Sequence, residues 1–454
     1  MISRRSFIGA GSALLAVAGY AANGKDEKKE VMQGFDERDA GKLSKTPWKP
    51  FSDKKVRVGI AGEGVCSFGS QFAYQTHPNV EVVSVTDLDP ARCKLLQERT
   101  RAQKTYPSCE ELIKNAAADK IEALYIATDA PSHARLAIMA LEHGLNVASA
   151  VPAFFGKDQL DLVPKIVEAA KKSGKLYMMN ETTAFRPECV AMRRLFEGGA
   201  IGKHVYTEGE YFHYWGTQGI PSYNGWRHGL PPQYYPTHSN GFYTCTTHGS
   251  FTEVTCVGIT SDLPDFKDAK NPHNNPFGSE VAFFKTSDGG AARMAVMWDS
   301  PGYHGETGRI NGSKGSYGTY SSVYTGQEKE LAQKLELAKA VLPPGVDAGG
   351  HGGSHAYLTD DFIRGILVPG HKVCCDIKTS LDTTIAGVYA HLSALKGGET
   401  MNIPQISNMV GASAPLARGR AGRASLPVTN KRSSQCSAEE DFLAGLPLFS
   451  PPAV

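Results

Sequence analysis

Between residues 56 and 180, short apolar runs alternate with longer segments whose apolar residues recur at helical spacing. Short β-branched or aliphatic runs are typical of buried strands, and the longer period is typical of helices. The expected strands begin at Val56, Val80, Ala123, Leu145 and Leu176. The expected helices span Ser70–Thr76, Pro90–Gln103, Ser108–Ala117, Pro131–Gly144 and Asp158–Ser173. This alternation predicts a doubly wound parallel sheet with helices on both faces.

The pattern changes near Pro187. A helix over Cys189–Glu197 is followed by strand-like runs without helices between them, at His204–Tyr214, Val254–Ile259, Val281–Thr286 and Ala291–Trp298. Consecutive strands without crossover helices predict a large, open, mostly antiparallel sheet. Further helices are expected over residues 327–341, 356–365 and 381–395, the second of them returning toward the first sheet. The sequence therefore predicts an α/β fold, with one domain over residues 55–186 and a second over 187–404.

Residues 1–22 have the features of an export signal. Arg4 and Arg5 precede an apolar stretch from Ile8 to Ala21, which is too short for a comfortable membrane span. Small residues near its end allow cleavage. Because twin-arginine signals export folded proteins, we expect a periplasmic protein with no stable membrane span after signal removal. An uncleaved anchor is the alternative.

Two further segments are expected to lie outside the domains. Residues 23–54 are polar and predict an extended arm, in which Trp48 and Phe51 cover an edge of their own domain or of a neighbouring subunit. Residues 405–454 are rich in Ala, Gly, Ser, Arg and Pro and show no apolar period, which predicts a disordered tail.

Composition excludes several classes of function. The chain is 41% hydrophobic and 21% charged, as soluble globular proteins are, and its net charge of +2 does not favour a nucleic-acid partner. Its nine cysteines show no metal-binding spacing. We therefore predict no metal centre and expect most cysteines to be buried as small apolar residues.

A glycine-rich turn follows the first strand. Gly62 and Gly64 fit the first two glycines of G-x-G-x-x-G, but Ser67 occupies the third position and Gly69 lies two residues further on. The free N–H groups of such a turn suit a pyrophosphate, and the carboxylate of Asp87 suits a ribose hydroxyl. A tight strand–helix turn is the simpler alternative. The predicted NAD-binding residues are Gly62, Glu63, Gly64, Asp87, Thr128, Pro131, His133, Ala150, Val151, Glu181 and Thr182.

Three polar clusters could carry chemistry. The first places Tyr211 and His213 on one face of a predicted strand. The second runs from Trp226 to His238, and the third is the glycine-rich segment Gly349–His355, where Ser354 could cap the next helix. Tyrosine and histidine pairs suit proton exchange with sugar hydroxyls. The predicted catalytic residues are Tyr211, His213, Tyr235 and His238, and the predicted substrate-binding residues are Arg227, Trp226, Thr237 and His355.

Several segments together resemble the Gfo/Idh/MocA oxidoreductases over residues 55–404. They are VGIAGEG with VTDLD, IATDAPSHARLAIMALEHGLNV, KLYMMNETTAFRP, LFEGGAIGKHVYTEGEYF, NGSKGS and SHAYLTDDF. The resemblance implies an N-terminal Rossmann domain, a C-terminal open-sheet domain and NAD(P)-dependent oxidation of sugars or related polyols. It also implies dimers or tetramers built through the sheet face. Asp87 at its position then favours NAD over NADP.

One position departs from that family. Typical members carry Glu-Lys-Pro where this chain has Ala150-Val151-Pro152, so the lysine that exchanges a proton with the reacting hydroxyl is absent. A branch without this lysine, the NAD-dependent glycosidases of the α-N-acetylgalactosaminidase type, is similar at Val151-Pro152, Glu208–His213 and Tyr235–His238. This chain differs from the branch at Thr182, where asparagine is expected. The similarity implies glycoside cleavage by transient oxidation at C3, elimination and hydration, without net consumption of NAD.

Three hypotheses follow from these residues. The first is an exported NAD(H)-dependent oxidoreductase that acts on a pyranose sugar or glycoside with tightly bound NAD. The second is redox-assisted glycoside cleavage at the same site. The third is a non-catalytic relative that binds a nucleotide or sugar, since the usual lysine is missing.

Overall fold

The computed structural model describes residues 43–410, except 217–218, 220, 269, 303–304 and 319–328. The expected export signal, most of the expected arm and nearly all of the expected tail lie outside the described residues. The described part belongs to one compact unit.

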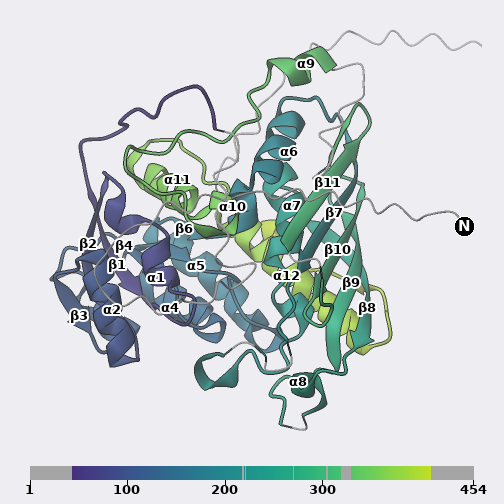
Figure 1. Ribbon diagram of the computed structural model, residues 1–454, viewed down its shortest axis with the longest axis horizontal. Coiled ribbons are helices and arrows are strands. Elements are labelled where there is room, and N and C mark those ends of the chain that lie inside the picture. The colour runs from purple at the N-terminus through teal and green to yellow at the C-terminus, as the bar shows by residue number, and fades with distance from the viewer. Residues whose placement is uncertain are drawn as a thin grey trace, which may run out of the picture. The chain divides into compact units, whose positions relative to one another are not determined.

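The first sheet has six parallel strands in the order β3-β2-β1-β4-β5-β6 (Figure 1). Its strands are β1 (Val56–Ala61), β2 (Val80–Thr86), β3 (Lys104–Tyr106), β4 (Ala123–Ile126), β5 (Asn146–Ser149) and β6 (Tyr177–Met179). The connecting helices are α1 (Phe68–Gln71), α2 (Pro90–Thr100), α3 (Cys109–Asn115), α4 (His133–Glu142) and α5 (Val163–Ser173). This is the strand order of dinucleotide-binding Rossmann sheets, so the predicted doubly wound architecture is confirmed.

The first predicted helix is much shorter than expected. In place of a helix over residues 70–76, the chain forms the four-residue α1 and a separate 3₁₀ turn, Tyr74–Thr76. Ala73, between them, has a positive φ of 62°, which no α-helix can accommodate. The helix dipole available to a phosphate at this turn is correspondingly small.

The second sheet has seven strands in the order β12-β11-β7-β10-β9-β8-β13 (Figure 1). They are β7 (His204–Phe212), β8 (Phe251–Thr260), β9 (Phe277–Thr286), β10 (Ala291–Met297), β11 (Gly305–Gly312), β12 (Ser316–Gly318) and β13 (Met401–Asn402). Only the β7–β10 pair is parallel among these pairings. The prediction of a large, mostly antiparallel sheet is therefore confirmed.

The helices of this region include several that were not expected. They are α6 (Pro187–Glu197), α7 (Thr237–Thr247), α8 (Pro264–Lys267), α9 (Lys329–Lys334), α10 (Gly350–Gly353), α11 (His355–Leu367), α12 (Ile377–Leu395) and α13 (Ile406–Val410). The expectation of strands without helices between them was wrong, because α7 connects β7 to β8. The helix expected over residues 327–341 was also too long, since α9 ends at Lys334 and irregular backbone follows it.

Two segments from outside the first sheet complete its core. Leu358, Phe362 and Ile363 of α11 are buried against residues of β1, β2 and β4, so the predicted return of this helix is confirmed. The described end of the arm lies over α11, where the Trp48 indole donates to Asp360 and Phe51 stacks under the Arg364 guanidinium at 4.2 Å. As expected, these aromatic residues cover their own chain.

Candidate active site

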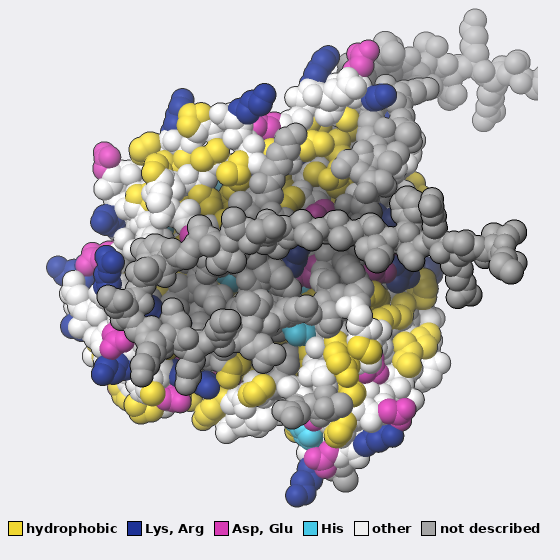
Figure 2. Space-filling view, in the orientation of Figure 1, with side chains coloured by type: hydrophobic (Ala, Val, Ile, Leu, Met, Phe, Trp, Pro, Cys, Tyr) yellow, Lys and Arg dark blue, Asp and Glu magenta, His cyan; other side chains and the backbone are white. Residues whose placement is uncertain are grey.

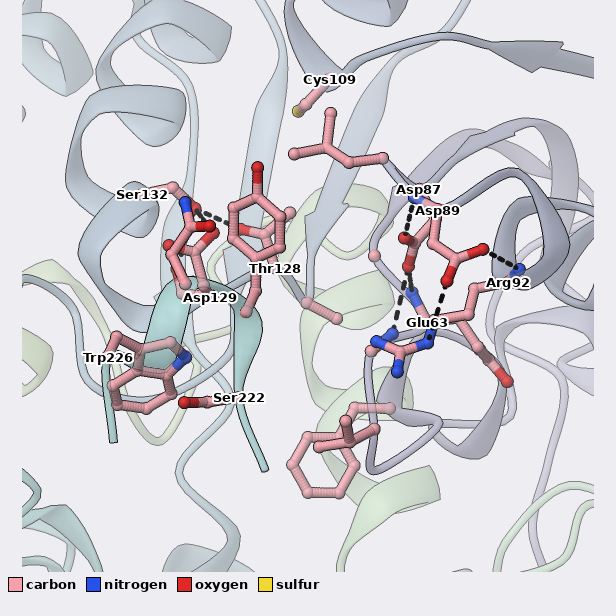
Figure 3. A pocket seen from close by; sticks show the side chains of 18 of the residues that line it. Glu63, Asp87, Asp89, Arg92, Cys109, Thr128, Asp129, Ser132, Ser222 and Trp226 are labelled. Carbon is pink, nitrogen blue, oxygen red and sulfur yellow. Dashed lines mark hydrogen bonds and ion pairs between the residues drawn. The ribbon is translucent and has the colours of Figure 1, made fainter. Parts of the chain in front are cut away.

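A cavity of about 850 Å³ lies beyond the carboxyl ends of β1, β2 and β4 (Figure 3). One wall is the glycine turn after β1, and another is the segment from Pro221 to Arg227, which precedes α7. The size suits a dinucleotide, and the position is where parallel α/β sheets bind their ligands. Five of the predicted cofactor residues are among those that line it: Gly62, Glu63, Gly64, Asp87 and Thr128.

Close packing explains two of the glycines in the turn. A Cβ on Gly62, whose φ is 93°, would lie 2.5 Å from the carbonyl oxygen of Ala127. A Cβ on Gly69 would collide with the carbonyl oxygen of Gly62. Gly69 therefore provides the close approach of helix to strand that the third motif glycine normally provides, although the sequence places it two residues late.

Asp87 ties the end of β2 to the glycine turn. Its Oδ2 accepts hydrogen bonds from the backbone N–H groups of Glu63 at 2.8 Å and Gly64 at 3.1 Å (Figure 3). The Glu63 carboxylate points to a different partner, since its Oε1 pairs with Arg99 at 2.6 Å and accepts from Ser70 at 2.8 Å. A ribose contact of Asp87 stays a prediction, and such a contact would add to these backbone bonds.

The other predicted cofactor residues support the wall rather than line it. His133 is buried, and its two ring nitrogens lie 2.8 Å from the Pro152 carbonyl oxygen and 3.2 Å from that of Thr128. Burial lowers its pKa. The Pro131 carbonyl accepts from the Gln159 amide at 2.6 Å. Ala150, Val151, Glu181 and Thr182 are buried behind the described lining.

A buried polar cluster joins β7 to the start of α7. Tyr211 and His213 both point inward from β7, as the strand alternation predicts, with ring centroids 6.0 Å apart. The Tyr211 ring lies edge-on to His238 at 4.8 Å, and Tyr235 lies 5.7 Å from the same imidazole. The structure thus brings the four predicted catalytic residues into one cluster.

Glu181 holds the central imidazole of that cluster. Its Oε1 lies 2.9 Å from Nδ1 of His238, and both side chains are buried. Burial alone would lower the pKa of His238, but the Glu181 and Glu306 carboxylates outweigh it and raise that pKa. Burial likewise opposes the ionised form of Glu181, but His238 lowers the pKa of this carboxyl, with help from Thr237. The pair therefore fixes the proton on Nδ1 and leaves Nε2 as the basic nitrogen.

Sequence reasoning missed the partner network behind this pair. Glu306 on β11 accepts hydrogen bonds from Arg186 Nε at 2.6 Å, from Arg186 Nη2 at 2.7 Å and from the Thr183 hydroxyl at 2.8 Å. The Thr182 hydroxyl also lies 3.2 Å from His238 Nδ1. β11 consists of glycines and polar residues apart from Ile310, so no apolar pattern marks this strand.

The glycine-rich segment before α11 lies against the cluster. His351 and His238 have ring centroids 5.7 Å apart. His355, the predicted substrate residue, is one layer further back and stacks on Phe72 at 4.1 Å. Ser354 does not cap α11, because its hydroxyl donates to the His351 carbonyl at 2.7 Å. The motif was visible in the sequence, but only the structure shows which histidine faces inward.

Two cavity residues connect the cavity to the cluster. Phe68 lines the cavity and lies 5.7 Å from His351 between ring centroids. Arg227 also lines it, with its guanidinium 4.6 Å from the centre of the Trp226 ring. Burial raises the pKa of Tyr235, and Arg227 partly offsets that shift. Substrate contacts of Trp226, Arg227 and Thr237 stay predictions.

Three further features of the described residues are the state of their cysteines, the length and hydropathy of their helices, and the charges on their surface. Every described cysteine is free and buried, as expected from the sequence. Among the described residues, no helix is both long and apolar enough to span a membrane. On the face shown in Figure 2, basic and acidic side chains are interspersed.

Comparisons with known proteins find similarity over part of the chain. Residues 56–181 match the family model described as oxidoreductase family, NAD-binding Rossmann fold. The chain is 30% identical to glycosyl hydrolase family 109 protein 1 of Bacteroides fragilis over 205 residues, which is 43% of this chain and 41% of the relative. It is 30% identical over 160 residues to inositol 2-dehydrogenase of Rubrobacter xylanophilus, or 34% of this chain and 44% of that protein. The matches thus span less than half the length of these curated relatives.

Solved structures share the whole described fold. Apo scyllo-inositol dehydrogenase of Lactobacillus casei aligns with a TM-score of 0.59 at 14% identity, covering 78% of this chain and 99% of that one. An oxidoreductase domain protein of Kribbella flavida aligns with a TM-score of 0.61 at 15% identity, covering 78% and 100%. At this identity the likeness concerns the fold alone. The matched family model, the strand order and the glycine turn together show that residues 56–181 are similar to the NAD-binding Rossmann fold of that oxidoreductase family.

Proposed function

We propose that this protein is an NAD-dependent oxidoreductase that acts on a pyranose sugar or glycoside. The observation that carries the proposal is the buried Glu181–His238 pair, which holds a basic imidazole next to a cavity of dinucleotide size. A general base in this position is what the oxidation of a secondary hydroxyl requires. The family and the sugar-acting names of its relatives support the same class of substrate.

The residues around the cavity fit NAD. The backbone of Gly62 comes so close to Ala127 that no side chain could stand there, and the N–H groups of Glu63 and Gly64 hold the Asp87 carboxylate at the end of β2. Asp87 and Asp89 both line the cavity at the end of β2, where their charges would repel a 2′-phosphate. NAD is therefore favoured over NADP.

Bound NAD would supply the acceptor for a hydride from the sugar carbon. The chain's own residues must then accept the hydroxyl proton, and we assign this role to His238 Nε2. Glu181 stabilises the imidazolium that forms, because its carboxylate accepts a hydrogen bond from the Nδ1–H of His238 at 2.9 Å. Tyr211 and Tyr235 lie against this imidazole and His213 lies against Tyr211, and these side chains would orient the sugar ring. His238 thus takes over the proton exchange for which Val151 leaves no lysine.

Redox-assisted glycoside cleavage is the second candidate for the same site. It is favoured by the relatives named glycosyl hydrolase family 109 and by the α-N-acetylgalactosaminidase of Bacteroides fragilis, which is 30% identical over 95 residues. In such a reaction the cofactor is restored in each turnover, which would suit a protein exported with its nucleotide already bound. The export itself rests on the twin-arginine pattern at residues 4–5. Replacing both arginines by lysine should retain the protein in the cytoplasm, as fractionation would show.

The two reactions are separated by one assay on the full chain loaded with NAD. An aryl α-N-acetylgalactosaminide and free N-acetylgalactosamine serve as the glycoside and pyranose probes, and aglycone release and NADH absorbance are followed together. Accumulating NADH supports net oxidation, whereas aglycone release without NADH supports cleavage. If the protein binds NAD but gives neither signal, both candidate reactions are contradicted. The remaining hypothesis is then a non-catalytic relative.

The open face of the second sheet is proposed as the contact between subunits. Val257 and Ile259 on β8 and Phe283 on β9 point away from the core and are 55%, 43% and 53% exposed. Large apolar side chains in adjacent rows of a sheet are typical of surfaces that become covered. We therefore propose a dimer or tetramer built through this face.

A further inference from the structure

Lys339 is a buried lysine next to the glycine-rich segment that precedes α11. The residue is only 1% exposed, and its Nζ donates to the carbonyl oxygens of Gly352 at 2.7 Å and Gly353 at 3.1 Å. The centre of the Tyr357 ring lies 5.0 Å from the same nitrogen, within the range of a cation–π contact. Two consecutive carbonyls and the first turn of α11 therefore meet at one ammonium group.

A cation in this place is costly unless its contacts compensate. Lysine is almost never fully buried without partners, because its charged group loses the surrounding water. The ammonium also lies at the N-terminal end of α11, where the helix dipole opposes positive charge. The hydrogen bonds to the two carbonyl oxygens offset these costs, and they fix the carbonyls as firmly as they fix the lysine.

The backbone that Lys339 holds has an uncommon conformation. His351, Gly352 and Gly353 have positive φ values of 51°, 64° and 68°, and we call residues 351–353 the left-handed loop. Only glycine adopts such backbone readily, and a strained run persists only where its surroundings hold it. Removing the donor to two of its carbonyl oxygens should therefore let the left-handed loop relax.

Lys339 can hold the loop because its own backbone is anchored elsewhere. The N–H of Ser44 donates to the Lys339 carbonyl at 2.6 Å, and Leu43 pairs with Lys339 in a parallel bridge. Arg194 of α6 also donates to the Ala338 carbonyl at 2.7 Å. The lysine is thus anchored by contacts that do not involve the left-handed loop.

The left-handed loop packs against the polar network of the candidate active site. A Cβ on Gly352 would lie 3.2 Å from Nη1 of Arg186, so no side chain fits between them. Arg186 holds Glu306 through Nε at 2.6 Å and Nη2 at 2.7 Å. The Thr183 hydroxyl then joins Glu306, at 2.8 Å, to the His238 carbonyl oxygen, at 3.1 Å. A displaced loop would therefore disturb the support of the proposed base.

We propose that Lys339 is a positioning residue of this active site, whose ammonium holds the left-handed loop against the Arg186–Glu306 pair. Its effect on turnover rests on the proposed function, whereas its effect on the loop can be measured without a substrate. Lys339 is not among the residues that line the cavity, and it transfers no proton.

The effect on the loop is tested by crystal structures of the full chain with NAD, as wild type and as Lys339→Met. Methionine is unbranched and apolar and has no N–H donor. We expect the carbonyls of residues 352 and 353 to turn away and the positive φ values of the loop to change. If Lys339→Met does not fold, Lys339→Gln takes its place, with the same expectation. An unchanged loop in the folded variant would overturn the inference whatever its activity.

Kinetics with the glycoside and pyranose probes then test the effect on turnover. Lys339→Met should lower kcat about 10- to 100-fold, as misplaced catalytic groups do, while the Kd for NAD changes by less than about threefold. Lys339→Arg keeps charged donors and should recover part of this loss. Lys378→Met is the matched control, because Lys378 pairs with Asp382 at 2.6 Å and Ser250 at 2.8 Å and does not line the cavity. It should lower the melting temperature and leave kcat unchanged.

The outcomes separate the inference from the function beneath it. An active wild type whose kcat is unchanged in Lys339→Met, or falls equally in Lys378→Met, would contradict the inference alone. A loss in Lys339→Arg as large as in Lys339→Met would also contradict it, since charged donors would then make no difference. A wild type that binds NAD but turns over neither probe would contradict the proposed function, and the loop in Lys339→Met would still decide whether the lysine holds it.

Discussion

Replacing Glu181 by glutamine should remove the charge that makes His238 basic while keeping the shape of the site. Oε1 of Glu181 accepts both the Thr183 N–H at 2.8 Å and His238 Nδ1 at 2.9 Å. An amide oxygen can accept the same two bonds, so the imidazole should keep its tautomer. A hydrogen bond to a charged partner contributes about 1.5–3 kcal/mol, and losing the charge should therefore lower kcat roughly 10- to 150-fold.

The pH profile gives the more specific signature of this change. The Glu181 carboxylate raises the pKa of His238 above its ordinary value, and only the neutral ring can act as the base. Activity of the wild type should therefore rise with pH through a limb above the ordinary range of histidine. In Glu181→Gln the pKa of His238 falls, so the limb should move toward lower pH.

The assay is kcat/KM against pH for both proteins, with thermal unfolding followed in parallel. Glu280→Gln is the matched control, because Glu280 pairs with His391 at 2.7 Å and both are fully buried, while neither is among the residues that line the cavity. It should lower the melting temperature and leave the pH limb in place. An unmoved limb in Glu181→Gln, with kcat within threefold of wild type, would refute the role of the pair.

Three other changes test separate parts of the structure. Asp87→Asn should weaken NAD binding about tenfold or more and reduce the preference for NAD over NADP, measured by titration calorimetry. Unchanged affinities would contradict the placement of Asp87 at the ribose. Gly69→Val should cost about 1–3 kcal/mol of unfolding free energy, since its Cβ meets the Gly62 carbonyl, and an unchanged denaturation midpoint would count against that close contact. Phe283→Glu should lower the mass in light scattering, whereas equal masses would exclude the open sheet face as the interface.

The hydrophobic pattern was sufficient to predict most strands of the first sheet, because these strands are buried on both faces and therefore form continuous apolar runs in the sequence. It failed at α7, whose residues Thr237–Thr247 are mostly small, polar or β-branched. Such residues have low helix propensity, and this helix exists because it is packed on every side, with Thr237–Thr246 all buried. Local sequence contains no signal for stabilisation of that kind.

The site was predictable in its residue types but not in its pairings. Strand alternation placed Tyr211 and His213 on one face, and the structure agrees. Glu306 could not be found, since β11 has Ile310 as its single apolar residue among glycines and polar side chains. Gly308 is required because a Cβ there would strike the Phe242 ring. Likewise, hydrogen bonds from the neighbouring backbone determine which of His351 and His355 faces the cluster, and residue spacing does not encode these bonds.

The identity of the nucleotide in the cavity is the most direct test of the central claim. The full chain would be purified without added cofactor, denatured, and its released small molecules identified by mass spectrometry, with titration of NAD and NADP into any empty fraction. We expect NAD to be released, or to bind more tightly than NADP where the cavity is empty. No released nucleotide, together with no affinity for either dinucleotide, would contradict the assignment of this cavity and of the chemistry built on it.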